Sequence, residues 1–484
     1  MPRPLALLLT AVALFGVAWA LVIPVQQAPD EGAHIAYAQT VAVRHDLPGS
    51  GPNSASTEER FSIATALGGE LQGNPTRKPV WSSSAFKRWH SVSGRLSESD
   101  GGGPFRQAEN PPLYYAFESL PYWAVGGHFF DRVYAMRLWS SLMLLVTTAG
   151  AWLLAGEVFG RNRVLQLGAA AVAGLQPMVT FISSGVNPDS MLFALWSISL
   201  WLGVRILRRG LTLRDGVALG LVVGFAVTEK ATSWALVPAA LFVVALAARR
   251  LRARGVPGVG VAVAVAATML AFALPAGAWV ATAAALHRPV ANQEVDRNGR
   301  KAPSPTSLQT LREFGSYVWQ FYLPRLSSQT PFFGQGPGGI QLRDTWVNSG
   351  WAAFGWLEVR FPPWVYRVLE AFSVLSIAGG IAALGRAARY RRVDWAAVGF
   401  CVVAALGLLL LLHWAEYTIV KLDNQAFLQG RYILPLIPLG GLAVSGGISL
   451  LRRRWQSLAV ATLMAGLVIL QLGSLAITVD RYFV

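Results

Sequence analysis

The chain has 484 residues, of which 54% are hydrophobic and only 14% are charged, and its mean hydropathy is +0.44. This balance excludes an ordinary soluble domain and predicts an all-α polytopic membrane protein. The net charge of +16 does not indicate nucleic-acid binding, because the arginines fall between apolar runs, and the single cysteine, Cys401, excludes an intrachain disulfide or cysteine metal site.

The first apolar run extends from Leu5 to Ile23 and is long enough to cross a bilayer core of ~30 Å at ~1.5 Å per residue. Pro24 ends it. The same stretch has a weak signal-peptide cleavage pattern at Ala18-Trp19-Ala20. Because its apolar part is long for a signal core, we predict an uncleaved first membrane helix.

Asp30, Glu31 and His34 stand where this helix leaves the membrane. Acidic side chains beside a bilayer are costly unless they are solvated or used, so the two carboxylates are candidates for chemistry at the membrane surface. The alternative is that they cap the next helix, since aspartate is common before a first helical turn.

Hydrophobic runs along the chain predict about eleven membrane spans. The predicted spans are residues 4–23, 133–158, 164–182, 190–206, 213–228, 231–248, 258–286, 364–385, 394–414, 431–450 and 456–478.

The arginines between these spans indicate the topology. If the amino terminus is cytoplasmic, every cluster lies on the cytoplasmic side, as the positive-inside rule requires. Asp30 is then extracytoplasmic. The clusters are Arg161 and Arg163; Arg205, Arg208, Arg209 and Arg214; Arg249, Arg250, Arg252 and Arg254; Arg386, Arg389, Arg391 and Arg392; and Arg452, Arg453 and Arg454.

Two large segments then lie outside, residues 24–132 and 287–363, within one membrane domain of residues 1–484. The first contains turn-rich stretches and helical pieces such as residues 33–44, which we expect along the membrane face. It also contains Asn110-Pro111-Pro112-Leu113-Tyr114-Tyr115, which opens a short aromatic helix expected at the interface.

The second external segment contains the glycine-rich stretch 333–339. We reject a phosphate-binding loop there, because no Lys-Ser/Thr follows it. The tryptophans that come next suit either an interfacial belt or the faces of sugar rings, and the belt is the favoured interpretation. They are Trp346, Trp351, Trp356 and Trp364.

Residues Gly216 to Ala248 predict a helical hairpin whose first arm is too short to cross the core. Its tip, Glu229-Lys230, should therefore lie below the outer surface and face a water-filled cavity. Ionisable residues at this depth are functional candidates, although a Glu-Lys pair that only neutralises itself is the alternative. Gly185 to Asp189 form a similar external tip, for which we favour a helix cap at Asn187 or Asp189.

Gln429-Gly430-Arg431-Tyr432 opens the tenth span. Arg431 lies at its outer mouth, on the face opposite to the arginine clusters. A guanidinium there either snorkels to lipid headgroups or binds an anion, and its planar fork matches a phosphate.

Together these features resemble the GT-C superfamily of membrane glycosyltransferases. The resemblance rests on Asp30-Glu31 after one membrane helix, the Asn110–Tyr115 motif, the tip Lys230 and the late Gln-Gly-Arg-Tyr. Gly355-Trp356-Leu357-Glu358-Val359 and Pro363-Trp364-Val365-Tyr366 further resemble a bacterial branch known mostly as a domain of unknown function. The resemblance extends over nearly the whole chain.

The resemblance implies a GT-C-like bundle with a large first extracytoplasmic loop. It also implies an inverting enzyme that moves a sugar from a polyprenyl-phosphate carrier to an extracytoplasmic cell-envelope acceptor. The base would be Asp30, with Glu31 in reserve, and Arg431 and Lys230 would hold the phosphate. His34 would orient a carboxylate or contact the phosphate. The remaining candidate substrate-binding residues are Gln429, Tyr432 and Tyr114.

Some relatives in this superfamily use a divalent metal and others do not. The sequence has no dense acidic cluster that would require one, so no metal ligand is assigned. The rival function is a transporter or flippase of a lipid-linked saccharide, which would also need a cavity, a lysine and an arginine. Such a protein should show inverted repeats, and none is visible.

Overall fold

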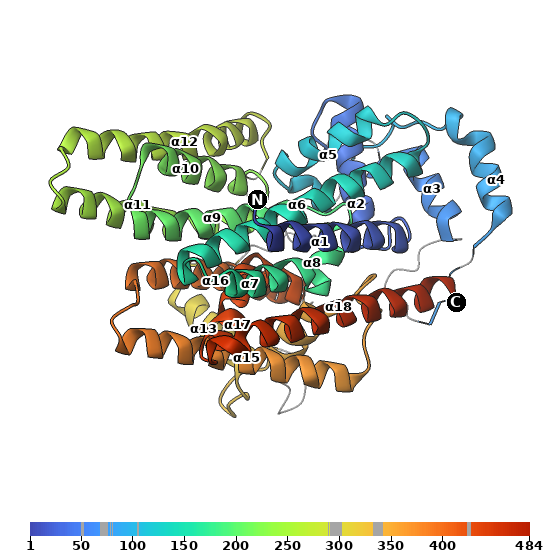
Figure 1. Ribbon diagram of the computed structural model, residues 1–484. Coiled ribbons are helices and arrows are strands. Elements are labelled where there is room, and N and C mark those ends of the chain that lie inside the picture. The colour runs from blue at the N-terminus through green and yellow to red at the C-terminus, as the bar shows by residue number, and fades with distance from the viewer. Residues whose placement is uncertain are drawn as a thin grey trace.

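The computed structural model describes residues 1–49, 53–67, 76–77, 79, 81–103, 106–288, 290, 303–332, 342–423 and 427–484. Over these ranges the regular structure is helical, apart from one isolated antiparallel bridge between Phe354 and Val359 (Figure 1). The prediction of an all-α polytopic membrane protein is confirmed. The glycine-rich stretch 333–339 lies outside the described residues.

Nine helices of the described chain are long and apolar enough to cross a membrane, or ten if one bent pair is a single span. They are α1 (Arg3–Val22), α6 (Phe129–Phe159), α9 (Asp189–Arg209), η4 with α11 (Ala231–Ala235, Leu236–Ala253), α12 (Gly258–Ala285), α15 (Pro363–Arg389), α16 (Trp395–Asp423), η6 with α17 (Gly430–Leu436, Ile437–Ser449) and α18 (Arg453–Phe483).

The difference from eleven spans has two physical causes. Helix α10 (Leu213–Val227) has 15 residues and therefore rises only about 22 Å, which is short of the bilayer core. The predicted span 164–182 is broken at Pro177 into α7 (Arg163–Leu175) and α8 (Pro177–Ser183), which meet at 55°. Proline cannot continue the hydrogen-bond ladder of the preceding helix, so the chain bends there.

The spans keep apolar side chains on their outward faces. On α15, for example, Leu375, Ile377 and Ile381 are well exposed. Aliphatic side chains in such numbers on one surface are suited to lipid tails rather than to water. The chain is therefore a multi-pass membrane protein.

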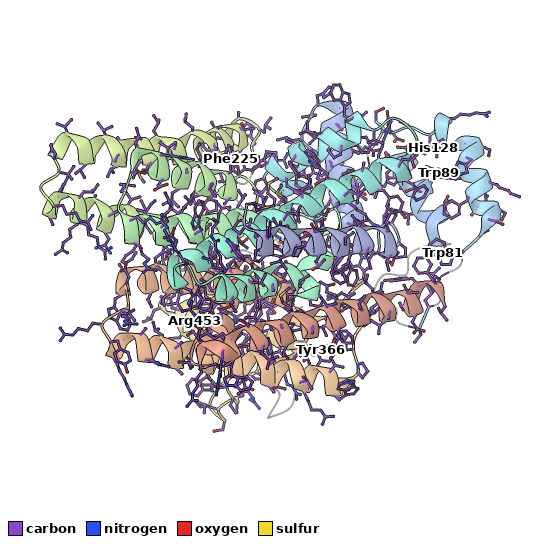
Figure 2. All side chains as sticks on the ribbon, viewed as in Figure 1. Trp81, Trp89, His128, Phe225, Tyr366 and Arg453 are labelled. Atoms are coloured by element: carbon purple, nitrogen blue, oxygen red, sulfur yellow. The ribbon has the colours of Figure 1, made fainter. Side chains whose placement is uncertain are left out.

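The first loop segment folds into short helices that pack over the ends of α1 and α6. A buried cluster that includes Tyr37, Trp89, Tyr115 and Phe129 joins them. Figure 2 shows Trp81 and Trp89 on the side of the molecule where α3 and α4 lie, away from Arg453 at the beginning of α18. The short helices are α2 (Glu31–Gln39), η1 (Thr40–Arg44), α3 (Thr57–Leu67), α4 (Ser83–Val92), η2 (Ser93–Arg95), η3 (Arg106–Glu109) and α5 (Leu113–Ala124).

In the second loop segment the described residues form three more short helices. Helix α13 covers one aromatic cluster with Tyr317 and Phe321, which pack with Tyr417 of α16. Where these short helices and those of the first loop lie relative to the membrane stays a prediction. They are α13 (Leu308–Tyr322), η5 (Arg343–Asn348) and α14 (Ser349–Trp351).

Contacts between elements bring the arginine clusters together at one end of the bundle. Arg205 of α9 pairs with Glu157 of α6, and Arg250 of α11 donates to the Leu207 carbonyl and pairs with Asp394. The side chain of Asn162, between Arg161 and Arg163, donates to Gln456 near the start of α18. The five clusters therefore lie on one side; which side of the membrane that is stays a prediction.

We predict that Gly101 to Gly103 lie outside the cell, because the arginine clusters indicate it. The nearby exposed Ser99 should therefore be labelled from outside, and Arg250 only after the membrane is opened. Since Cys401 is the one cysteine, a Cys401→Ser background allows single-cysteine variants at both positions. An impermeant maleimide then reports sidedness. Labelling of both positions from the same side would contradict the topology.

Candidate active site

Asp30 ends the loop between α1 and α2 in an unusual backbone conformation. Its φ of 61° and ψ of 7° lie in the left-handed region, which is strained for a residue other than glycine. It occupies the N-cap position of α2, yet its side chain makes no capping hydrogen bond. The carboxylate is instead one-third exposed, at 33%, and turns towards Arg431. Helix capping, the alternative from sequence, is not its role.

Arg431 lies at the start of η6 and is almost fully buried. Its Nη2 donates to Asp30 Oδ2 at 2.9 Å, and its Nε lies 3.9 Å from Asp189 Oδ2. The other two nitrogens, Nε and Nη1, have no hydrogen-bond partner. A buried guanidinium with unused donors is costly unless an anion completes its shell, so the fork points to an anion site.

The close crossing of two glycines sets the position of Arg431. A Cβ on Gly430 would come within 2.2 Å of the Gly350 nitrogen, so only glycine fits there. The Gly430 N–H donates to Ser349 Oγ at 2.7 Å, and Gln176 Nε2 donates to the Gly350 carbonyl at 2.6 Å. These bonds explain why glycine precedes the arginine in Gln-Gly-Arg-Tyr.

Lys230 approaches the same place from the tip after α10. Its Nζ forms an ion pair with Asp189 Oδ1 and lies 5.6 Å from the centre of the Tyr432 ring. Glu229 is fully buried, and neither of its carboxylate oxygens has a hydrogen-bond partner. The ion-pair partner of Lys230 is therefore Asp189 rather than Glu229.

Helix α10 holds this tip in place because it packs closely on α12. Small residues recur every four positions on the contact face, at Gly216, Gly220 and Gly224. A Cβ on Gly220 would meet the Thr268 carbonyl oxygen at 2.3 Å. The two helices lie side by side in Figure 1. Close backbone packing thus fixes the position of a helix that is shorter than the thickness of a bilayer core.

Glu31 has a different environment from Asp30. It is fully buried and accepts two bonds from Arg137 of α6, at 2.8 Å from Nε and 2.6 Å from Nη2. It also accepts from the backbone N–H groups of Gln26 and Val186. Four donors saturate this carboxylate, so it holds the loop and is not available to a substrate.

His34 lies one turn after Asp30 and is buried. Its Nδ1 is 2.9 Å from the Tyr115 hydroxyl, which also accepts from Asn110 Nδ2 at 2.9 Å. Burial lowers the pKa of His34 to about 4, although Asp30 opposes that shift. The imidazole is therefore neutral near pH 7.

Asp30 keeps its charge for a different reason. Burial tends to raise the pKa of its carboxyl, but the charge and hydrogen bond of Arg431 outweigh burial, and the pKa lies below its ordinary value. A carboxylate beside a neutral imidazole and two cations is thus ionised at any physiological pH.

The structure brings together five of the residues singled out from sequence: Asp30, His34, Lys230, Arg431 and Tyr432, whose hydroxyl accepts from Arg431 Nη2 at 3.2 Å. The Tyr114 hydroxyl lies away from them, fully buried, at 2.7 Å from Ser140 Oγ. Gln429 precedes the glycine crossing, and its Oε1 is buried without a partner.

Two residues of the site were missed. Asp189 lies beside both cations, whereas the sequence favours a helix cap at Asn187 or Asp189; the Asn187 side chain does accept from the Asp189 N–H, at 2.9 Å. A second acidic external tip is the signal for Asp189. Arg137 lies inside the predicted span 133–158. An arginine within a span is itself a signal, because lipid does not solvate its charge and it therefore needs a partner such as Glu31. As for metals, no group of three or more His, Cys, Asp or Glu side chains converges in the part of the chain that the structure describes.

Three comparisons place the chain among known proteins. No curated protein matches it. Its fold is similar to ArnT from Cupriavidus metallidurans in the apo state, with 15% identity and a TM-score of 0.46 over 96% of this chain and 62% of that one. The structure of the same protein bound to undecaprenyl phosphate has 14% sequence identity and a TM-score of 0.46, over 98% of this chain and 73% of that one.

The oligosaccharyltransferase of Archaeoglobus fulgidus, in complex with zinc and sulfate, gives 11% identity and a TM-score of 0.40, over 98% of this chain and 52% of that one. The chain thus spans less than two-thirds of the first of these proteins and about half of the last. Identities of this size carry no information about the reaction. A family model matches residues 13–440, and the chain belongs to that family, described as "Predicted membrane protein (DUF2142)".

Proposed function

We propose that this protein is an inverting glycosyltransferase that moves a sugar from a polyprenyl-phosphate carrier to an extracytoplasmic cell-envelope acceptor. The observation that carries the proposal is the pairing of a one-third exposed, strained Asp30 with a buried Arg431 whose Nε and Nη1 donors are unused. A base and an anion-binding fork thus face the same space, as transfer from a phosphate leaving group requires.

Asp30 is the base in this mechanism. A low pKa makes it a weak base, so it takes the acceptor proton only as the hydroxyl oxygen bonds to the anomeric carbon and becomes acidic. The departing phosphate then shares Arg431 with Asp30. As the phosphate attracts the guanidinium, the hydrogen bond from Arg431 to Asp30 weakens. Asp30 then becomes a better proton acceptor at the moment of transfer.

The two cations hold the leaving group. Arg431 offers Nε and Nη1, and Lys230 lies beside the Tyr432 ring with one carboxylate partner, Asp189. Negative charge grows on the phosphate oxygens as the glycosidic bond breaks, so cations already in place stabilise that state. The donor is membrane-bound, because nucleotide sugars are largely cytoplasmic and the proposed site is external.

The test is mass spectrometry of envelope glycans and lipid-linked sugars from a deletion strain. We expect loss of one sugar from the envelope and accumulation of its polyprenyl-phosphate donor. Complementation by the wild-type gene should reverse both changes, and Asp30→Asn should reverse neither. An unchanged glycan and donor profile would contradict the proposal.

A flippase predicts a different distribution of the same lipid. If the protein is a transferase, the accumulated donor in deletion-strain spheroplasts is exposed on the outer face, where an added sugar-cleaving enzyme or lectin reaches it. If it is a flippase, the donor stays on the inner face until the membrane is opened.

Replacing Arg431 tests the phosphate site. Arg431→Lys keeps the charge but loses the planar fork, so we expect polyprenyl phosphate to bind purified protein more weakly, and Arg431→Ala to bind weaker still, by about 10-fold or more. The exposed Arg454 serves as a matched control, with Arg454→Ala binding as wild type. Equal binding by Arg431→Ala and wild type would assign Arg431 to snorkelling and make Lys230 the next candidate.

The pH dependence of transfer follows from Asp30 and His34. The reactive form of Asp30 is the carboxylate, whose pKa lies below its ordinary value, and His34 is neutral above a pKa of about 4. Neither group changes charge between about pH 5 and 8, so we expect a flat rate over that range and loss only in stronger acid. Initial rates in proteoliposomes measure it. An acidic limb near pH 6 would contradict the assignment.

A further inference from the structure

A cleft lined by charged side chains lies at the far end of the bundle from Asp30. It has a volume of about 320 Å³ and opens between the ends of α6 and α9 and the start of α7. Four arginines line it against one carboxylate, Glu157, with Trp152 and Trp201 in its walls. We call it the arginine cleft; the arginines are Arg161, Arg163, Arg205 and Arg209.

The position of the arginine cleft relative to the membrane follows from helix lengths. Helix α6 passes from Arg137, which binds Glu31 beside Asp30, to Glu157 in the cleft. Twenty residues of α-helix rise about 30 Å, which is the thickness of a bilayer core. The cleft therefore lies at the opposite membrane surface, at headgroup level, where tryptophan is also favoured.

Two of the arginines are neutralised within the protein. Arg209 lies 2.8 Å from Glu157 Oε1, and Arg205 binds Asp215 through Nε at 3.1 Å and lies 3.8 Å from Glu157. Both carboxylates are buried, so these pairs form a fixed wall. They need no further partner.

The other two arginines are not neutralised. Neither Arg161 nor Arg163 makes an ion pair with a carboxylate among the residues that the structure describes, and both are exposed. They also stand at the amino-terminal end of α7, whose first turn contains no acidic residue. A helix amino terminus carries partial positive charge. Two arginines beside it are therefore repelled by that charge and by each other, unless an anion lies among them.

The ring of Trp152 fixes the orientation of one of them. The Arg163 guanidinium lies 5.7 Å from the ring centre, and its Nη1 donates to Gln166 Oε1 at 3.3 Å. Stacking and this bond hold the fork over the cleft. The positive-inside rule accounts for arginines on this side, but not for a cleft built around them.

From this arrangement we propose that the arginine cleft is a binding site for a phosphate-bearing anion, with an anionic phospholipid headgroup as its occupant. The headgroup phosphate lies between Arg161, Arg163 and the amino terminus of α7, while the acyl chains follow the exposed apolar face of α6, which includes Leu142, Val146 and Leu153. Basic pockets between membrane helices bind anionic headgroups in this manner. This site is independent of the proposed glycosyltransferase activity.

The test is the thermal unfolding of purified protein in detergent with three probes: short-chain phosphatidylglycerol, short-chain phosphatidylcholine and inorganic phosphate. We expect phosphatidylglycerol to raise the melting temperature of the wild type by about 3 °C or more, and phosphatidylcholine to raise it less. In Arg161→Gln/Arg163→Gln the difference between the two lipids should fall by at least half. Both side chains are exposed, so the variant should fold.

Arg454 provides the matched control, because it is an exposed arginine at the same end of the bundle that also lies over a tryptophan, Trp455. Arg454→Gln should keep the full lipid difference. If inorganic phosphate stabilises the wild type as strongly as phosphatidylglycerol and the double variant loses both effects, the phosphate site stands with a soluble source. If the double variant and Arg454→Gln respond alike, the effect is general charge attraction and the site is refuted.

Discussion

Asp30→Asn is expected to lower the turnover of sugar transfer by about 10²-fold or more without lowering the amount of folded protein. Asparagine has nearly the same shape and keeps an oxygen that accepts from Arg431, but it cannot take a proton. The strained backbone at φ 61° is also tolerated by asparagine. Binding of the donor should therefore change much less than turnover. Initial rates and donor affinity in proteoliposomes measure the two effects separately.

Asp46→Asn is the matched control, because Asp46 lies in the same loop segment, is exposed and accepts a local bond from the Leu47 N–H that asparagine can also accept. It should transfer sugar at the wild-type rate. Full activity of Asp30→Asn at a normal protein level would show that Asp30 is not the base and would contradict the proposed mechanism.

Sequence reasoning found the spans and most of the site for a physical reason. A bilayer demands long apolar helices and penalises charge, so span positions and exceptional charges are visible in one dimension. Arg431 and Lys230 stand out because they break that rule on the side predicted to be external. Whether α10 and the bent α7–α8 pair cross the membrane does not follow from this rule, since composition does not report how a short helix is held by its neighbours.

Pairing between distant residues was not predictable in this way. Asp30 meets Arg431 across 401 positions, and Glu31 meets Arg137 across 106. The sequence therefore does not decide whether Asp30 or Glu31 is the base, because the role of each carboxylate depends on which partner it meets. Asp30 is one-third exposed and meets a single donor, whereas Glu31 meets four donors in the interior.

Replacing Glu31 by Gln is expected to unfold or strongly destabilise the protein, with a loss of roughly 3–5 kcal/mol, because it leaves the fully buried Arg137 without a counter-charge. The effect spreads further, since Arg137 also donates to the carbonyls of Ala20, Ile23 and Pro24. These oxygens lie at the end of α1 and just beyond it, where carbonyls lack helical partners. One guanidinium thus joins the end of α1 to the loop that presents Asp30.

Arg137→Lys gives the second half of the same prediction. An ammonium has three donors and cannot make all five of the bonds that Arg137 donates, so the charge is kept while at least two hydrogen bonds in the interior are lost. We expect a melting temperature in detergent below that of the wild type but above that of Glu31→Gln.

Glu370→Gln is the control for both variants, because it removes the same charge from an exposed pair with Arg343 and should cost under about 1 kcal/mol. If Glu31→Gln melts as Glu370→Gln does, the buried pair does not hold the loop. If Glu31→Gln is as stable as the wild type and inactive, Glu31 acts in the chemistry itself and exchanges roles with Asp30. Destabilisation of Glu31→Gln, together with stable but inactive Asp30→Asn, would separate the residue that positions the loop from the residue that takes the proton.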